Sequence, residues 1–173
     1  MSDLLLYAAA LLAALAVRCF VLSIARIKGR SMLPTLQDKE WTLVWRLPYL
    51  IRAPRRFDVV ICRFPGRRMK LLPFLPQAFV KRVIGLPGET LEVVEGVLYI
   101  GGQPVPEPFL DAAHTRFFRQ RAPIILGPDE YFVMGDNRDN SNDSRRVGPL
   151  KRRDIAGRVV CVMWPPKGMR KVR

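Results

Sequence analysis

Histidine, cysteine and acidic side chains are all scarce in this chain of 173 residues. Its single histidine, His114, lies in loop-like sequence, which is a poor setting for the base of a Ser-His-Asp triad. Its three cysteines, Cys19, Cys62 and Cys161, form an odd and widely spaced set that matches neither a zinc site nor a disulfide framework. We therefore expect free buried thiols, no metal and no cofactor.

Long amphipathic helices are missing after residue 25. Short apolar runs are instead broken by 15 prolines and 12 glycines, which favours an all-β fold, either an antiparallel β-sandwich or a partly open barrel. The sequence predicts hairpin turns at Glu95-Gly96 and at Gly101-Gly102. The predicted strands cover residues 41–44, 58–64, 78–84, 90–94, 97–100, 131–134 and 155–164.

Acidic residues are outnumbered by basic ones, 15 Asp and Glu against 29 Lys and Arg, for a formal net charge of +14. Such a balance is typical of nucleic-acid-binding proteins. Here, however, the basic residues are scattered, with neither a recognition-helix pattern nor interleaved aromatics. We therefore expect no nucleic-acid partner and interpret the charge as suited to anionic lipid headgroups at a membrane surface.

One long apolar run is present, at the start of the chain. Residues 4–17 are unbroken apolar sequence, and residues 19–24 continue it after Arg18. Because about 20 helical residues cross a hydrocarbon core of about 30 Å, residues 1–25 are predicted to form a single N-terminal transmembrane helix. A cleavable secretory peptide is the alternative, with residues 14–16 as a small-residue cleavage site, although the chain opens without a positive charge. A buried core helix is disfavoured because the run is apolar on all sides.

A strongly polar stretch, called the polar box here, covers residues 135–145. It reads Gly-Asp-Asn-Arg-Asp-Asn-Ser-Asn-Asp-Ser-Arg and has no apolar side chain, yet apolar segments flank it on both sides. Short side chains that carry both donors and acceptors can satisfy one another. The polar box is therefore predicted to be an internally hydrogen-bonded scaffold rather than a solvated loop.

Two further segments indicate what this scaffold supports. Residues 29–36 read Gly-Arg-Ser-Met-Leu-Pro-Thr-Leu, and residues 79–89 read Phe-Val-Lys-Arg-Val-Ile-Gly-Leu-Pro-Gly-Glu. Strand alternation in the second segment would place Lys81 on one face and Arg82 on the other. A lysine that faces a core is costly unless it is neutral or paired, which makes Lys81 a candidate base. The alternative is a strand-edge lysine in water.

In this order, Ser-Met-x-Pro-Thr-Leu, Lys-Arg-Val-Ile-Gly-Leu-Pro-Gly-Glu and Gly-Asp-Asn-Arg-Asp-Asn-Ser-x-Asp-Ser-Arg resemble the signature boxes of bacterial type I signal peptidases (leader peptidases). These are membrane-anchored serine proteases with a Ser/Lys dyad, and the resemblance spans roughly residues 25–165. It implies an endopeptidase that removes signal peptides from translocated pre-proteins by cutting after small residues of the Ala-x-Ala type.

The resemblance also implies a location. Residues 1–25 would be a single-pass anchor in the plasma membrane, and residues 26–173 an extracytoplasmic catalytic domain with a short variable β insertion at about residues 91–128. Basic residues that follow a span normally favour the cytoplasmic side, but translocated domains of this length are largely exempt from that rule.

The resemblance makes Ser31 the nucleophile and Lys81 its base. Desolvation must then lower the pKa of Lys81 from about 10.4, and it can do so by up to about 5 units. Arg82, on the opposite face, would add a cation that further disfavours a charged Lys81. The Ser31 backbone N–H is one expected oxyanion donor. Some relatives add a hydroxyl two residues before the nucleophile, but here that position is Gly29, so the second donor is not identified.

The remaining site residues are assigned by the same resemblance. The support residues are Ser141, which would orient the lysine amine, Asp143 and Arg145, which would form a structural ion pair, and Asp136, which would pair with Arg82. The substrate-binding residues, expected to form shallow apolar pockets for small side chains, are Ile27, Met32, Leu36, Phe79 and Val80. The alternative is that these five are ordinary core residues.

Two rival interpretations are weighed against this one. Self-cleaving repressor proteases share the Ser/Lys device and a similar β-fold, but they carry a DNA-binding helical domain, which residues 1–30 do not resemble. An inactive, basic, membrane-tethered binding protein would keep the span and the charge but lose the dyad, whereas Ser31 and Lys81 are both present.

Overall fold

The fold is taken from a computed structural model, which describes residues 2–16, 21–68, 74, 76–115 and 121–172. The helices are α1 (Ser2–Ala16), α2 (Pro48–Ile51) and α3 (Ser144–Val147). The strands are β1 (Leu22–Arg26), β2 (Trp41–Trp45), β3 (Val59–Arg68), β4 (Pro76–Gly85), β5 (Thr90–Val94), β6 (Val97–Ile100), β7 (Gln103–Pro104), β8 (Arg121–Ile125), β9 (Glu130–Met134), β10 (Leu150–Lys151), β11 (Ile155–Trp164) and β12 (Arg170–Lys171).

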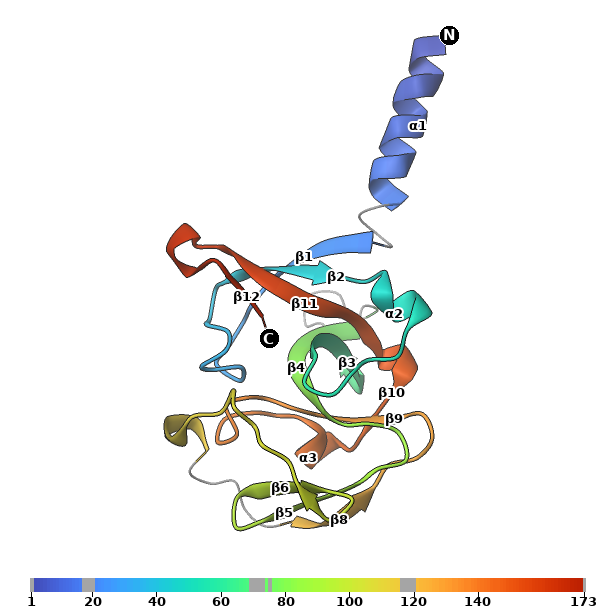
Figure 1. The fold of residues 1–173 in the computed structure, drawn as a ribbon. Helices are drawn as coiled ribbons and strands as arrows, with labels where there is room; N and C mark the ends of the chain where they lie inside the picture. The colour runs from blue at the N-terminus through green and yellow to red at the C-terminus, as the bar shows by residue number, and fades with distance from the viewer. Residues whose placement is uncertain (1, 17–20, 69–73, 75, 116–120, 173) are drawn as a thin grey trace.

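The strands form two antiparallel sheets (Figure 1). The larger sheet has the order β1-β2-β11-β3-β4-β9-β10, with β12 paired to β11, and the smaller sheet has the order β7-β6-β5-β8. In Figure 1, β1 and β2 lie at the end of the molecule from which α1 extends, and the smaller sheet lies at the opposite end. The expectation of a mainly β, antiparallel fold is confirmed.

The predicted hairpin turns are both present. Glu95 and Gly96, between β5 and β6, have φ values of 50° and 81°, and Gly101 and Gly102, between β6 and β7, have values of 57° and 77°. Two successive positive φ values suit the right-handed twist of the flanking strands, which explains glycine in these turns. The seven predicted strands each correspond to an observed strand, with ends that differ by a few residues.

The apolar N-terminal run divides into a helix and a strand. Helix α1 has 15 residues, and the end of the run forms β1, which pairs with β2 from Leu22↔Trp45 to Arg26↔Trp41. The domain boundary expected at residue 25 therefore falls inside a strand of the larger sheet. Arg18 and Cys19 lie outside the described residues. Over the part of the chain that is described, none of the helices has both the length and the apolar character needed to cross a membrane, so the transmembrane helix expected over residues 1–25 is not found.

Buried apolar side chains form three clusters. Neighbouring residues of β3 belong to different clusters, because Val59 packs beneath the 29–36 loop and Val60 packs on the opposite face. The third cluster, which includes Ile84, Leu91 and Met134, joins β4 and β9 to the smaller sheet. Since β4 lies between these clusters, its side chains alternate between two differently lined faces.

Candidate active site

Strand β4 brings Lys81 to Ser31, which lies 50 positions earlier in the chain. Lys81 Nζ is 2.8 Å from Ser31 Oγ and donates to the Val80 carbonyl oxygen at 3.0 Å. Lys81 is 2 % exposed and pairs across the sheet with Val60, a residue of the apolar cluster on that face. The alternative of a strand-edge lysine in water is therefore wrong.

The pKa of Lys81 is lowered from its ordinary value, chiefly because burial disfavours the charged amine. The charges of Asp143 and Asp136, and that of Cys62 if it were ionised, act in the opposite direction, and Arg145 adds to the lowering. The Cys62 thiol is itself buried, which raises its pKa to about 12, so it is uncharged at neutral pH. Desolvation thus prevails, and the amine beside Ser31 is biased toward its neutral form.

Arg82 lies on the opposite face of β4 and is completely buried. Its Nε and Nη2 donate to the two carboxylate oxygens of Asp136 at 2.8 and 2.7 Å, and Nη1 donates to the Phe57 carbonyl at 2.9 Å. Thr35 donates to Asp136 at 2.5 Å and accepts from Arg82 at 3.1 Å. The expected pair is present, but Arg82 is not the arginine that lowers the pKa of Lys81; that cation is Arg145. Through Thr35, the pair connects β4 to the loop that carries Ser31.

The polar box is internally hydrogen-bonded, as expected. Arg145 donates to both carboxylate oxygens of Asp143 at 2.8 and 2.9 Å and to the Arg138 carbonyl at 2.8 Å, and the Gly135 N–H donates to Asp143 at 2.9 Å. Burial raises the pKa of Asp143, but the bonds from Arg145 and Gly135 outweigh it, and the net pKa is lowered. Asp143 is thus kept in its charged form by the hydrogen bonds that it accepts within the box.

Ser141 Oγ makes no hydrogen bond to the lysine amine. A Cβ added to Gly135 would be 2.3 Å from Ser141 Oγ and 2.4 Å from the Ser31 carbonyl oxygen, so Gly135 lies against both residues. The Ser141 hydroxyl lies near enough to Asp143 to lower its pKa, yet this buried oxygen has no partner at hydrogen-bonding geometry among the described residues. The role of Ser141 in orienting Lys81 stays a prediction.

The expected oxyanion donors differ in availability. The Ser31 N–H has no hydrogen-bond acceptor within the described parts of the chain, and Ser31 is half-buried. The Gly29 N–H, in contrast, donates to Asp38 at 2.8 Å, and Gly29 has no side chain to offer. Gly29 is therefore not a free second donor, and the Ser31 N–H is the one that is open to a ligand.

The five expected pocket residues are only partly brought together. Ile27, Met32 and Leu36 are 3 %, 1 % and 0 % exposed and pack in one cluster, against which the half-buried Val80 also packs. Phe79 lies on the other face, where its ring centroid is 5.2 Å from that of Phe64. Three of the five are thus closed to solvent and lie beneath the site, so their contact with substrate stays a prediction.

The histidine and the cysteines were expected to have no catalytic role. His114 Nδ1 is 2.5 Å from Asp111 on a 3₁₀ turn, and the structure gives it no contact with Ser31. Cys62 is buried and free, as expected, whereas Cys161 is free but only half-buried. Nowhere in the described ranges do His, Cys, Asp and Glu side chains gather in a group that could hold a metal ion.

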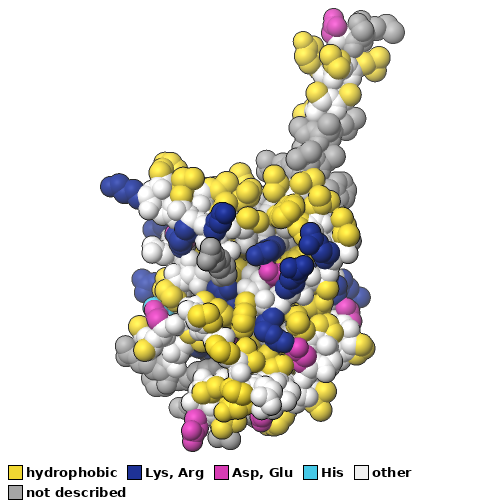
Figure 2. Space-filling view, viewed as in Figure 1, with side chains coloured by type: hydrophobic (Ala, Val, Ile, Leu, Met, Phe, Trp, Pro, Cys, Tyr) yellow, Lys and Arg dark blue, Asp and Glu magenta, His cyan; other side chains and the backbone are white. Residues whose placement is uncertain are grey.

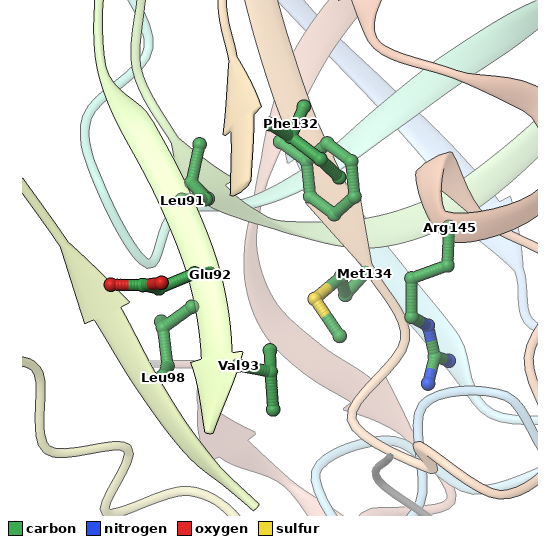
Figure 3. A pocket seen from close by; sticks show the side chains of 8 residues that line it. Leu91, Glu92, Val93, Leu98, Phe132, Met134 and Arg145 are labelled. Carbon is green, nitrogen blue, oxygen red and sulfur yellow. The ribbon is translucent and has the colours of Figure 1, made fainter. Parts of the chain in front are cut away.

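An apolar pocket lies away from the Ser31–Lys81 pair, between the smaller sheet and β9 (Figure 3). Phe132 and Met134 of β9 point into it, whereas the Glu92 carboxylate points away from it. Arg145 is its connection to the polar box. The residues that line it are Leu91, Glu92, Val93, Leu98, Ile124, Phe132, Met134 and Arg145.

Several residues that hold the site were missed by the sequence analysis. From the insertion, Glu107 forms an ion pair with Arg138 of the polar box, and the centroid of the Phe109 ring lies 3.9 Å from the Arg82 guanidinium carbon. Thr35 and Asn137 connect the nucleophile loop to the polar box. The signal available in the sequence was the presence of arginines in a box predicted to be closed to water. A buried arginine requires acceptors, and some of these can come from elsewhere in the chain.

Comparisons with known proteins identify the family of the chain. A family model described as "Signal peptidase, peptidase S26" matches residues 2–164. Signal peptidase I of Leptolyngbya laminosa is 39% identical over 152 residues, which cover 88% of this chain and 73% of that protein. Signal peptidase I S of Bacillus subtilis (strain 168) is 36% identical over 172 residues, which cover 94% and 88%.

A solved structure is also similar, the crystal structure of a signal peptidase I from Enterococcus faecalis V583. It is 32% identical with a TM-score of 0.49, over 62% of this chain and 97% of that one. The assignment itself rests on the sequence matches, which define a serine endopeptidase. More particularly, the chain belongs to the signal peptidase family, peptidase S26, and its function is that of signal peptidase I.

Proposed function

We propose that Ser31 and Lys81 are the catalytic dyad of this signal peptidase. The observation that carries the proposal is the 2.8 Å contact between Lys81 Nζ and Ser31 Oγ, made by a lysine that is 2 % exposed. The neutral amine accepts the hydroxyl proton while Ser31 Oγ attacks the scissile carbonyl, and the resulting ammonium protonates the leaving amine. Water then hydrolyses the acyl-enzyme: Lys81 takes a proton from the attacking water and passes it to the departing Ser31 Oγ, which restores the hydroxyl and the neutral amine.

The surrounding residues hold this pair in place. Asp136 with Arg82 and Asp143 with Arg145 are buried ion pairs that fix geometry more than they add stability. Ser141 lies against Gly135, as the Ser31 carbonyl does, and its hydroxyl would turn to Lys81 when substrate binds. The Ser31 N–H stabilises the oxyanion.

Selectivity for small residues at the first and third positions before the cut would come from the apolar surface at this site. Val80 is half-buried at its rim, and Ile27, Met32 and Leu36 form the floor beneath, whereas Phe79, on the other face of β4, would act only on the Lys81 side. Because these floor residues are closely packed, the pocket cannot become deeper. A larger substrate side chain at either position would therefore clash with them.

The enzyme would act at the plasma membrane, with residues 26–173 outside the cytoplasm and the N-terminal segment as the anchor. Figure 2 shows hydrophobic side chains gathered at the end of the domain nearest α1, with lysines and arginines beside them. Trp41 and Trp45 of β2 and Trp164 of β11 are exposed there, and the Arg26 guanidinium lies 5.8 Å from the Trp41 ring centroid. Exposed tryptophan and arginine together suit an interface rich in anionic lipid.

Substitution of the dyad tests the proposal. Ser31→Ala, Lys81→Ala and the double variant should each abolish cleavage of a pre-protein by the same large factor, because nucleophile and base act as one unit. Thermal unfolding, followed by circular dichroism, serves as the folding control. Turnover close to that of the unsubstituted enzyme in either single variant would refute the mechanism.

A further inference from the structure

Asn137 of the polar box is hydrogen-bonded to the backbone carbonyls of two consecutive residues, Arg30 and the nucleophile Ser31. Its Nδ2 donates to the Arg30 carbonyl at 3.1 Å, and its own N–H donates to the Ser31 carbonyl at 3.1 Å. Its Oδ1 accepts from the Asn140 N–H at 3.1 Å, which fixes the side-chain amide. Asn137 is 6 % exposed, so these bonds are little disturbed by water.

The bond to Arg30 has a consequence for the next residue. The Arg30 carbonyl and the Ser31 N–H belong to one planar trans peptide group, in which C=O and N–H point in opposite directions. A donor that holds the carbonyl therefore also sets the direction of the N–H. A second donor to the same carbonyl, the Leu33 N–H at 3.3 Å, closes the local turn but leaves the peptide less firmly held.

The direction of the Ser31 N–H matters because the site offers few other oxyanion donors. Gly29 has no hydroxyl, and its N–H is already donated to Asp38. The Ser31 N–H, in contrast, has no acceptor among the residues that the structure describes. A single donor must already point at the position of the oxyanion before the reaction begins, because it stabilises the transition state best when no reorientation is needed.

We propose that Asn137 is a positioning residue that aims the Ser31 N–H at the oxyanion by holding the Arg30–Ser31 peptide plane. This inference rests on the proposed dyad mechanism and adds to it a residue that touches neither substrate nor Lys81. The residue acts on the transition state and not on the binding of the substrate, because the negative charge develops only as Ser31 attacks.

The test compares Asn137→Leu with Asn140→Ala in the full chain. Leucine has nearly the shape of asparagine but cannot donate to Arg30. Asn140 is exposed and contributes its backbone N–H, which alanine retains, so the second variant is a matched control. Asn137→Ala, which also lacks the Nδ2 donor and adds no charge, is the second variant if leucine prevents folding.

The readouts are kcat, KM, the pH dependence of kcat/KM and the affinity for a peptide aldehyde, whose adduct with Ser31 carries an oxyanion-like oxygen. Asn137→Leu should lower kcat about 10- to 100-fold, below the loss for complete removal of an oxyanion donor. KM and the midpoint of the acidic limb should stay unchanged, aldehyde affinity should fall with kcat/KM, and Asn140→Ala should match the unsubstituted enzyme.

Two results would overturn the inference. One is an unchanged kcat in Asn137→Leu, or in Asn137→Ala if that variant is the one that folds. The other is a loss confined to KM or accompanied by a shifted acidic limb, which would mean that Asn137 acts on substrate binding or on Lys81. Failure of the dyad proposal is recognised separately, by cleavage in Ser31→Ala, whatever the Asn137 variants do.

Discussion

At the scale of single residues, the position of the nucleophile depends on Gly135, which has no side chain. A Cβ at this residue would lie 2.4 Å from the Ser31 carbonyl oxygen and 2.3 Å from Ser141 Oγ, distances at which something must move. The Gly135 N–H also donates a hydrogen bond to Asp143 at 2.9 Å, so the backbone at Gly135 cannot easily move away from Ser31. The polar box thus supports Ser31 by direct backbone contact.

Gly135→Ala should therefore reduce both activity and stability. We expect kcat/KM for a pre-protein to fall more than about 10-fold, because the methyl group displaces the Ser31 carbonyl, and the free energy of unfolding to fall by about 1–3 kcal/mol from overpacking. Gly168→Ala is the matched control, since its Cβ would be no closer than 3.5 Å to any neighbour. Activity in Gly135→Ala equal to that of the control would contradict this account of the box.

At the scale of elements, strands with a clear alternation were predictable from the sequence. β5 reads Thr-Leu-Glu-Val-Val, and its alternate residues Leu91 and Val93 face the core, with the half-buried Glu92 between them, as expected for a half-buried strand. β1 was missed because its residues continue the apolar run before it, and sequence alone cannot tell a hydrophobic strand from the end of a hydrophobic helix. β7, β10 and β12 have two residues each, too few for any pattern.

The site was predictable where it depended on local sequence and unpredictable where it depended on long-range contacts. The placement of Lys81 and Arg82 on opposite faces followed from strand alternation. The Glu107–Arg138 pair and the packing of Phe109 on Arg82 could not be predicted, because they join the insertion to distant elements. The three closed pocket residues could not be distinguished from core residues, since both types are apolar.

The buried pair between β4 and the polar box provides a prediction at this scale. Asp136→Asn should lower the free energy of unfolding by about 3–5 kcal/mol, because it leaves the charge of Arg82 buried without a counter-ion. Urea unfolding measures the change. Lys151→Ala, which breaks an exposed pair with Glu130, is the control and should have little effect. Equal stability of the two variants would mean that Arg82 is neutralised by another group.

At the scale of the whole molecule, the exposed aromatic end and the N-terminal segment lie together. An enzyme held at a membrane through this end meets a membrane-inserted substrate in one plane, so that their encounter becomes effectively intramolecular. The cut would then fall just beyond the membrane-embedded segment of the pre-protein. The packed floor beneath the site would decide which residues are accepted there.

A substrate series tests this selectivity. Pre-proteins with Ala, Leu or Lys at the first or third position before the cut are inserted into vesicles and incubated with the full chain. Ala substrates should be cleaved, and Leu and Lys substrates should show kcat/KM at least about 10-fold lower, since a clash rejects more strongly than a missing contact attracts. Equal rates for Ala and Leu would refute the assignment of the pocket residues.

The pH dependence of kcat/KM tests the central claim most directly, because the mechanism requires a neutral Lys81. At a pH below the pKa of Lys81 the amine is protonated and cannot accept the Ser31 proton, so activity should rise with increasing pH through that pKa. Since burial lowers the pKa, the midpoint should lie well below the ordinary lysine value of about 10.4 and should be the same in His114→Ala. A midpoint at the ordinary lysine value, or an acidic limb that disappears in His114→Ala, would contradict the account.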